Sequence, residues 1–168
     1  MDRNTRILAT RLLLSGGVIS LSAPAAADFV KDSKASLELR NFYFNRDYRQ
    51  DNAAQSKQEE WAQGFLLRYE SGFTEGLIGV GFDAIGLLGV KLDSSPDRAG
   101  SGLLKRHRDT SKGAQDEYGE LGLTAKVRAS KSTLKLGTLL PKLPTVLAND
   151  SRLLPQTFKG GQLTSLEL

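Results

Sequence analysis

The sequence predicts an all-β fold, namely an antiparallel up-and-down transmembrane β-barrel. Residues 118–129 alternate between apolar or small side chains and mostly polar ones, which is the period of a strand whose two faces meet different surroundings. The chain opens with an export signal, and no apolar run long enough for a spanning helix follows it. Its strand-like segments are joined by long and short connections in turn, as in bacterial outer-membrane barrels.

Residues 1–27 have the features of a secretory signal peptide. Three arginines precede the apolar run 12–21, and alanines at 25–27 form a small-residue cleavage site. The apolar run holds two glycines and two serines, well short of the roughly 20 apolar residues that a spanning helix needs. We therefore expect residues 1–27 to be removed and residues 28–168 to form the N-terminal part of a barrel domain.

The first three strand-like segments follow this signal. Residues 34–47 place Leu37 and Leu39 at odd positions, opposite charged residues at even positions. Residues 59–72 carry large apolar and aromatic side chains at odd positions, and residues 76–90 carry apolar side chains at even positions. All three have the period of two that a strand requires.

Three more segments complete the prediction. They are 118–129, 132–140, and a segment that begins near residue 156 and is still in progress at residue 168. Segments of roughly 9 to 15 residues suit tilted strands that cross a bilayer.

The connections between these segments alternate in length. Residues 71–74 and 130–131 are tight turns, whereas 48–58, 91–116 and 141–155 are long and polar. Bacterial barrels have short periplasmic turns and longer extracellular loops, so the alternation favours a barrel.

Charge and composition exclude several functions. Loss of the signal removes three basic residues and one acidic residue, leaving 20 Lys+Arg against 18 Asp+Glu, a net charge of +2 instead of +4. No basic cluster is interleaved with aromatic residues, so we do not expect nucleic-acid binding. The chain has no cysteine and a single histidine, His107, so we expect no metal site, and we expect no cofactor. No constellation of nucleophile, base and oxyanion hole can be assembled, so we expect no catalytic residues and no enzyme.

Several sequence segments resemble the OprD family of outer-membrane porins of Gram-negative bacteria. These segments are ASLELRNFYFNR at 35–46, EWAQGFL at 60–66, SGFTEG at 71–76, DAIGLLGVKL at 83–92, LPKLP at 140–144 and NDSRLLPQTFKGG at 149–161. The resemblance implies an 18-stranded barrel, of which this chain supplies about six N-terminal strands. It also implies passage of small water-soluble nutrients, especially those that bear a carboxylate.

The resemblance implies a constriction as well. In the family the third extracellular loop folds inward, and by strand count this loop is 141–155, so the constriction candidates are Asn149, Asp150 and Arg152. Family members usually have Gly where this chain has Ser151. That difference bears on the backbone of the loop, because Gly permits conformations that Ser resists.

Charged side chains on the strands are expected to point away from lipid. A charge that faces lipid near the midplane costs about 2–4 kcal/mol. The cations expected on the inner wall are Arg40, Arg68, Lys126, Arg128 and Lys135. They can contact a passing carboxylate, or they can pair with the acidic residues Glu38, Glu70, Asp83 and Glu120 on the same face; the sequence leaves both readings open.

Aromatic residues are expected near the membrane interfaces. The candidates for aromatic girdles are Trp61, Phe42, Tyr43, Phe44 and Tyr69, although ordinary strand aromatics in a soluble core are the alternative.

The sequence therefore predicts an outer-membrane channel for passive, selective uptake of small carboxylate or amino-acid solutes. Expected partners are outer-membrane lipid, the barrel-assembly machinery and periplasmic chaperones. Six strands cannot close a barrel, and the chain ends on Leu166-Glu167-Leu168 without the usual terminal aromatic, so we expect a truncated fragment that does not conduct alone. The alternative is an exported soluble β-rich binding or structural module. Lys at Leu123 or Val80 is expected to abolish insertion of a porin, and Lys at Thr124 to be tolerated.

Overall fold

The computed structural model describes residues 29–50 and 52–167, so the predicted signal peptide lies outside the described residues. The strands are β1 (Lys34–Asp47), β2 (Lys57–Glu70), β3 (Ile78–Asp93), β4 (Glu117–Ala129), β5 (Ser132–Leu139) and β6 (Phe158–Ser165), and a 3-10 helix, η1, spans Thr110–Lys112. No helix in 29–50 or 52–167 is long and apolar enough to cross a membrane.

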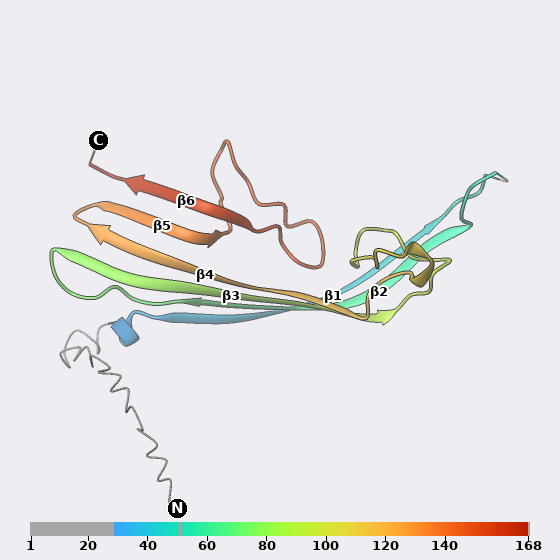
Figure 1. Cartoon of the computed structure of the whole chain (residues 1–168), viewed down its shortest axis with the longest axis horizontal. Coiled ribbons are helices and arrows are strands. Elements are labelled where there is room, and N and C mark those ends of the chain that lie inside the picture. The colour runs from blue at the N-terminus through green and yellow to red at the C-terminus, as the bar shows by residue number, and fades with distance from the viewer. Residues whose placement is uncertain (1–28, 51, 168) are drawn as a thin grey trace, which may run out of the picture.

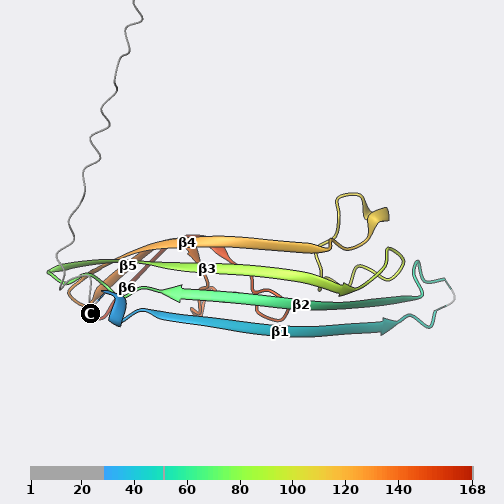
Figure 2. The same ribbon diagram turned by 90° about the horizontal axis from the view of Figure 1, so that it is seen from below.

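The strands form one sheet in chain order, and each strand pairs antiparallel with the next (Figure 1). Seen from below, β1 to β4 run side by side as long ribbons (Figure 2). The prediction of an all-β antiparallel up-and-down fold is therefore confirmed. Within the described residues β1 and β6 are the two edges of this sheet.

The predicted strand boundaries hold to within about two or three residues, except at the end of β6. The predicted start near residue 156 is two residues early, but the prediction that the strand is still in progress at residue 168 is wrong, because β6 spans Phe158–Ser165. At the start, the amide of Gln156 donates to the carbonyl of Asn149, so Gln156 belongs to the preceding loop. At the end, Ser165 pairs with Ser132, the first residue of β5, and the amide of Leu166 donates to the carbonyl of Lys131 in the β4–β5 turn, where the ladder stops.

The register gives the sheet two chemically different faces. Val80, Val127, Leu134 and Leu163 form one row across β3 to β6, and all four side chains are exposed. We call this apolar, exposed side the outer face. The opposite side, which carries Arg40, is the inner face. The alternation seen in the sequence therefore separates a surface suited to lipid from a polar one.

The buried side chains lie on the inner face, beneath the loops. One cluster joins Ala62 of β2 to the loop residues Leu103 and Leu153, and a second joins Leu66 of β2 to Leu87 of β3. The core of these six strands is thus formed between the wall and the loops that fold back over it.

The aromatic residues divide between the two faces. Tyr43, Trp61 and Tyr69 belong to the outer face, but Phe42 and Phe44 pair with Ala62 and Glu60 of the inner face, so their assignment to a girdle is wrong. Because side chains alternate along a strand with a period of two, Phe42 and Phe44 lie on the same face of β1 as Arg40.

The outer-face aromatics mark two levels along the wall. Tyr69 packs on Phe82, with ring centroids 5.4 Å apart, near the short β2–β3 turn. Trp61 lies eight positions away on β2, which is about 26 Å along a strand. A tilt of roughly 35–45° reduces this to about 20 Å across the bilayer, close to the roughly 25 Å apolar band of outer-membrane barrels.

Candidate functional site: the inner face of the wall

The sequence-predicted cations all lie on the inner face. Arg40 is opposite Gly64, and Arg68 is opposite Ile85. Lys126 lies between Gly81 and Lys135, and Arg128 lies between Gly79 and Thr133. The strand register therefore brings five cations from four strands onto one surface.

One ion-pair network joins this wall to the loop 141–155. Arg40 donates to both carboxylate oxygens of Asp150, at 2.6 and 3.0 Å, and to Glu38 at 2.7 Å. Arg68 donates to the other oxygen of Glu38 at 2.9 Å. Arg40 holds the pKa of Asp150 below its usual value, because its two hydrogen bonds favour the charged carboxylate.

A second network is centred on Asp83 of β3. The two oxygens of Asp83 lie 2.6 Å from the ammonium of Lys126 and 2.9 Å from that of Lys135. The Lys126 side chain is only 6% exposed, and its ammonium also donates to the carbonyl of Ser71 at 2.6 Å. Lys135 is 35% exposed, so the two lysines have very different access to water.

Phe73 lies in the β2–β3 turn, and sequence reasoning did not single it out. The ammonium of Lys126 lies 4.8 Å from its ring centroid, and the guanidinium of Arg128 lies 4.5 Å away. The turn reaches the inner face because Gly79 and Gly81 leave room: a Cβ on Gly79 would lie 3.1 Å from that of Phe73. The alternating glycines of β3 could have indicated in the sequence that another segment, here the turn with Phe73, lies close to this strand.

The three constriction candidates lie in one segment but have different contacts. Asp150 binds Arg40, Arg152 donates to the carbonyl of Ser101 at 3.1 Å, and the Asn149 side chain accepts from the amide and hydroxyl of Ser151. Within the described residues the one non-glycine residue with positive φ is Ser130, so Ser151 fits without left-handed backbone. Loop 141–155 lies over the inner face, as the resemblance implied.

A second loop, 94–116, is fixed at the long-loop end of the wall. The buried carboxylate of Glu60 accepts hydrogen bonds from the amide of Gly100 and the hydroxyl of Ser101. Sequence reasoning missed Glu60, whose partners lie some 40 residues away. Because Arg152 donates to the carbonyl of Ser101, loops 94–116 and 141–155 meet at this residue.

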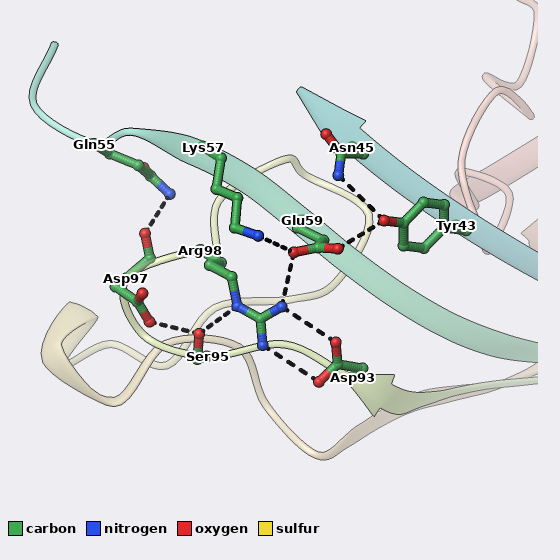
Figure 3. Close-up of polar contacts among 9 residues, drawn as sticks. All are labelled: Tyr43, Asn45, Gln55, Lys57, Glu59, Asp93, Ser95, Asp97 and Arg98. Carbon is green, nitrogen blue, oxygen red and sulfur yellow. Dashed lines mark hydrogen bonds and ion pairs between the residues drawn. The ribbon is translucent and has the colours of Figure 1, made fainter. Parts of the chain in front are cut away.

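A polar cluster on the outer side of this rim also holds loop 94–116 (Figure 3). Arg98 donates to Glu59 at 2.8 Å and to Asp93 at 3.3 Å. Glu59 also accepts from the hydroxyl of Tyr43 at 2.7 Å and pairs with Lys57 at 2.7 Å. The sequence could have indicated this cluster, because Glu59 places a carboxylate at the end of the mostly apolar outer face of β2.

A hollow of 140 Å³ lies on the inner face between the two ion-pair networks. Its lining includes Arg68, Asp83 and Lys135, together with the apolar side chains of Ile85 and Leu140. Thr124 also lines it and lies on the inner face, as the prediction for a Lys at this position assumed, but its side chain is buried and its hydroxyl donates to the carbonyl of Thr138. No group of acidic, histidine or cysteine side chains within the described residues could hold a metal ion.

An antiparallel sheet with an apolar outer face, a charged inner face and loops folded over that inner face is the wall of an outer-membrane channel. The chain belongs to the OprD family of outer-membrane porins, because the model of that family matches residues 27–168. The family consists of outer-membrane channels rather than enzymes, as the sequence predicted, and its members lie in the outer membrane.

Individual relatives agree with this assignment. The chain is 47% identical to the porin-like protein GalP of Pseudomonas putida over 150 residues and 43% identical to porin D of Pseudomonas aeruginosa over 159 residues. These matches cover 89% and 95% of this chain but only 36% and 34% of the relatives. The chain therefore spans about a third of the length of these relatives.

Solved structures show the same fold. The crystal structure of Pseudomonas aeruginosa OccK9 (OpdG) is 63% identical, with a TM-score of 0.79, over 83% of this chain and 36% of that one. A BenF-like porin from Pseudomonas fluorescens is 45% identical, also with a TM-score of 0.79 and the same coverage.

Proposed function

We propose that these residues form the N-terminal wall of a channel for passive, selective uptake of small water-soluble solutes that bear a carboxylate, amino acids among them. The observation that carries the proposal is the hollow between the two networks, where Arg68 and Lys135 face the same space. The Pseudomonas aeruginosa relative OpdK was solved with vanillate, and a solute of that kind would present a carboxylate to this wall.

The cations of the inner face have different roles in this proposal. Arg40 and Lys126 are 17% and 6% exposed and are engaged with Asp150 and Asp83, so they hold loop and turn in place. Arg68 and Lys135 are 30% and 35% exposed, so a solute can reach them. Arg128 is exposed and is positioned by the ring of Phe73.

The carboxylate would bind by charge-assisted hydrogen bonds. Arg68 donates to Glu38 through one terminal nitrogen and presents a planar guanidinium beside the hollow, and Lys135 adds a point charge from β5. Asp83 balances part of this charge, so binding stays weak enough for the solute to leave.

Six strands by themselves are proposed not to conduct. The smallest outer-membrane barrels have 8 strands, and an open edge in lipid leaves backbone groups unpaired at several kcal/mol each. Insertion is proposed to use the barrel-assembly machinery and periplasmic chaperones, since unpaired strand edges would otherwise aggregate.

The test compares charged and neutral solutes of equal size. In protein isolated from outer membranes, as the cell makes it, the double substitution Arg68→Gln and Lys135→Gln is expected to slow carboxylate permeation into vesicles roughly tenfold. Permeation of the neutral solute is expected to stay unchanged. Lys57→Gln, on the outer rim, is the control and is expected to alter neither. Equal slowing of both solutes, or of neither, would contradict the proposal.

A further inference from the structure

Besides its ion pair with Arg40, the loop 141–155 packs on the wall through one fully buried apolar side chain. Leu153 is 0% exposed and lies over Gly64 of β2 and Gly89 of β3, which are directly paired across the two strands. A Cβ on Gly64 would lie 3.2 Å from Leu153 Cδ1, and one on Gly89 would lie 3.1 Å from Leu153 Cδ2. We call Gly64 and Gly89 the glycine recess.

These glycines are explained by space and not by backbone conformation. The described glycines with positive φ are Gly76, Gly100, Gly102, Gly113 and Gly137, so neither glycine of the recess needs a left-handed backbone. Glycine inside a strand weakens it by roughly 0.5–1 kcal/mol relative to Ala, and it often marks the close approach of another segment. Here the approaching segment is the loop, since the carbonyl oxygen of Leu153 would be 3.1 Å from a Cβ on Gly64.

The recess also makes room for the ring of Tyr118 of β4, which is paired with Gly89. A Cβ on Gly89 would lie 2.6 Å from Cε1 of Tyr118, whose hydroxyl donates to the carbonyl of Leu103 in loop 94–116. Leu103 and Leu153 belong to the same buried cluster. The pair of glycines thus makes room for Leu153 and Tyr118, and the second loop contacts both of these side chains through Leu103.

We propose that the glycine recess sets how far loop 141–155 stands from the wall, and thereby the bore of the channel and the size limit of its solutes. The inference rests on the proposed channel function. A side chain in the recess displaces Leu153 toward the channel axis, because the strands behind it leave no other direction.

The test exchanges volume between wall and loop. Gly64→Val adds three carbon atoms and Leu153→Ala removes three, so the double variant restores the total volume. Gly160→Val is the matched control, because nothing lies within 4 Å of a Cβ added at Gly160. Residues 1–168 contain no cysteine, so spin labels can be placed on Cys introduced at Ser151 of the loop and at Leu39 of the outer face.

The distance between the labels is measured in protein isolated from outer membranes as the cell makes it. Gly64→Val is expected to lengthen it by roughly 2 Å, because contacts near 3.2 Å must open to about 3.5–4.0 Å and Val carries two carbons beyond Cβ. Single-channel conductance is expected to fall with the longer distance. Adding Leu153→Ala is expected to restore both quantities, and Gly160→Val to change neither.

An unchanged label distance in Gly64→Val, or a label distance in the double variant no closer to that of the parent than in Gly64→Val, would contradict the proposal that the recess positions the loop. A longer label distance with unchanged conductance would contradict the proposal that the recess sets the bore of the channel. If Gly64→Val does not fold, Leu153→Ala alone is expected to broaden the distance distribution, and an unchanged distribution would overturn the proposal. A parent protein that forms a closed barrel but does not conduct would contradict the proposed function, while the label distances would still decide whether the recess holds the loop.

Discussion

The substitution Asp83→Asn is expected to lower the free energy of unfolding by about 2–3 kcal/mol, because it leaves the ammonium of Lys126 without its carboxylate. The Lys126 and Asp83 side chains are 6% and 16% exposed and lie 2.6 Å apart. Breaking a buried pair by removing one partner costs about 3–5 kcal/mol. Lys126 keeps the carbonyl of Ser71 and the ring of Phe73, which offset part of this loss.

The control is Lys135→Gln, which removes the more exposed partner of the same carboxylate. Its pair with Asp83 is screened by water, so the expected loss is at most about 1 kcal/mol. Asp83 still has Lys126 in this variant. The two variants should therefore differ by at least about 1 kcal/mol, which is a factor of roughly five or more in the ratio of folded to unfolded protein.

The assay is denaturant unfolding of protein isolated from outer membranes and held in lipid vesicles. Trp61, the single tryptophan of this sequence, is on the outer face and reports by fluorescence. Transition midpoints convert to free energies when the slopes of the variants agree. Equal losses for Asp83→Asn and Lys135→Gln would refute the reasoning from burial.

Three further outcomes are expected. Leu123→Lys puts a charge on the lipid face at a cost of about 2–4 kcal/mol, so this variant should not be recovered in outer-membrane fractions. Gln162→Lys, on the inner face, should be recovered there, and equal recovery of the two variants would contradict the assignment of the faces. Phe73→Ala removes the ring under Arg128 and should lower anion preference in reversal potentials, by up to about fivefold; an unchanged preference would exclude this positioning. The pKa of Asp150 lies below its usual 3.8, so its ion pair with Arg40 stabilises the loop above that pH and is lost as the pH falls through the lowered pKa. Proteolysis of the loop should therefore become faster only in that acidic range, whereas Asp150→Asn should make it faster at pH 7.

The strands and their faces could be predicted because they depend on local periodicity. A period of two places Leu123 outward and Lys126 inward whatever the rest of the chain does. The aromatic run shows where residue type misleads, because Phe42 and Phe44 resemble girdle residues but their parity puts them on the inner face. Position in the period was the better guide.

The loop contacts could not be predicted, because no local pattern encodes them. Arg40 and Asp150 are 110 residues apart, and Glu60 meets the hydroxyl of Ser101 41 residues away. The glycine recess forms only when β2 and β3 pair in register and a loop from beyond β5 returns to cover them. Sequence can suggest that a strand glycine needs a reason, but the approaching residue is fixed by topology.

The inner face also shows why charge alone does not identify a solute site. Five cations with the same sequence signature divide by what already surrounds them. Arg40 and Lys126 are nearly enclosed by carboxylates and carbonyls of the chain, so in the proposed channel they would act on a solute only through the loop and turn that they contact. Arg68 and Lys135 share their carboxylates with a neighbouring cation and stay open to water beside the hollow. The two proposals therefore assign selectivity for charge and limitation of size to different residues of one wall, and they predict that each can be altered without the other.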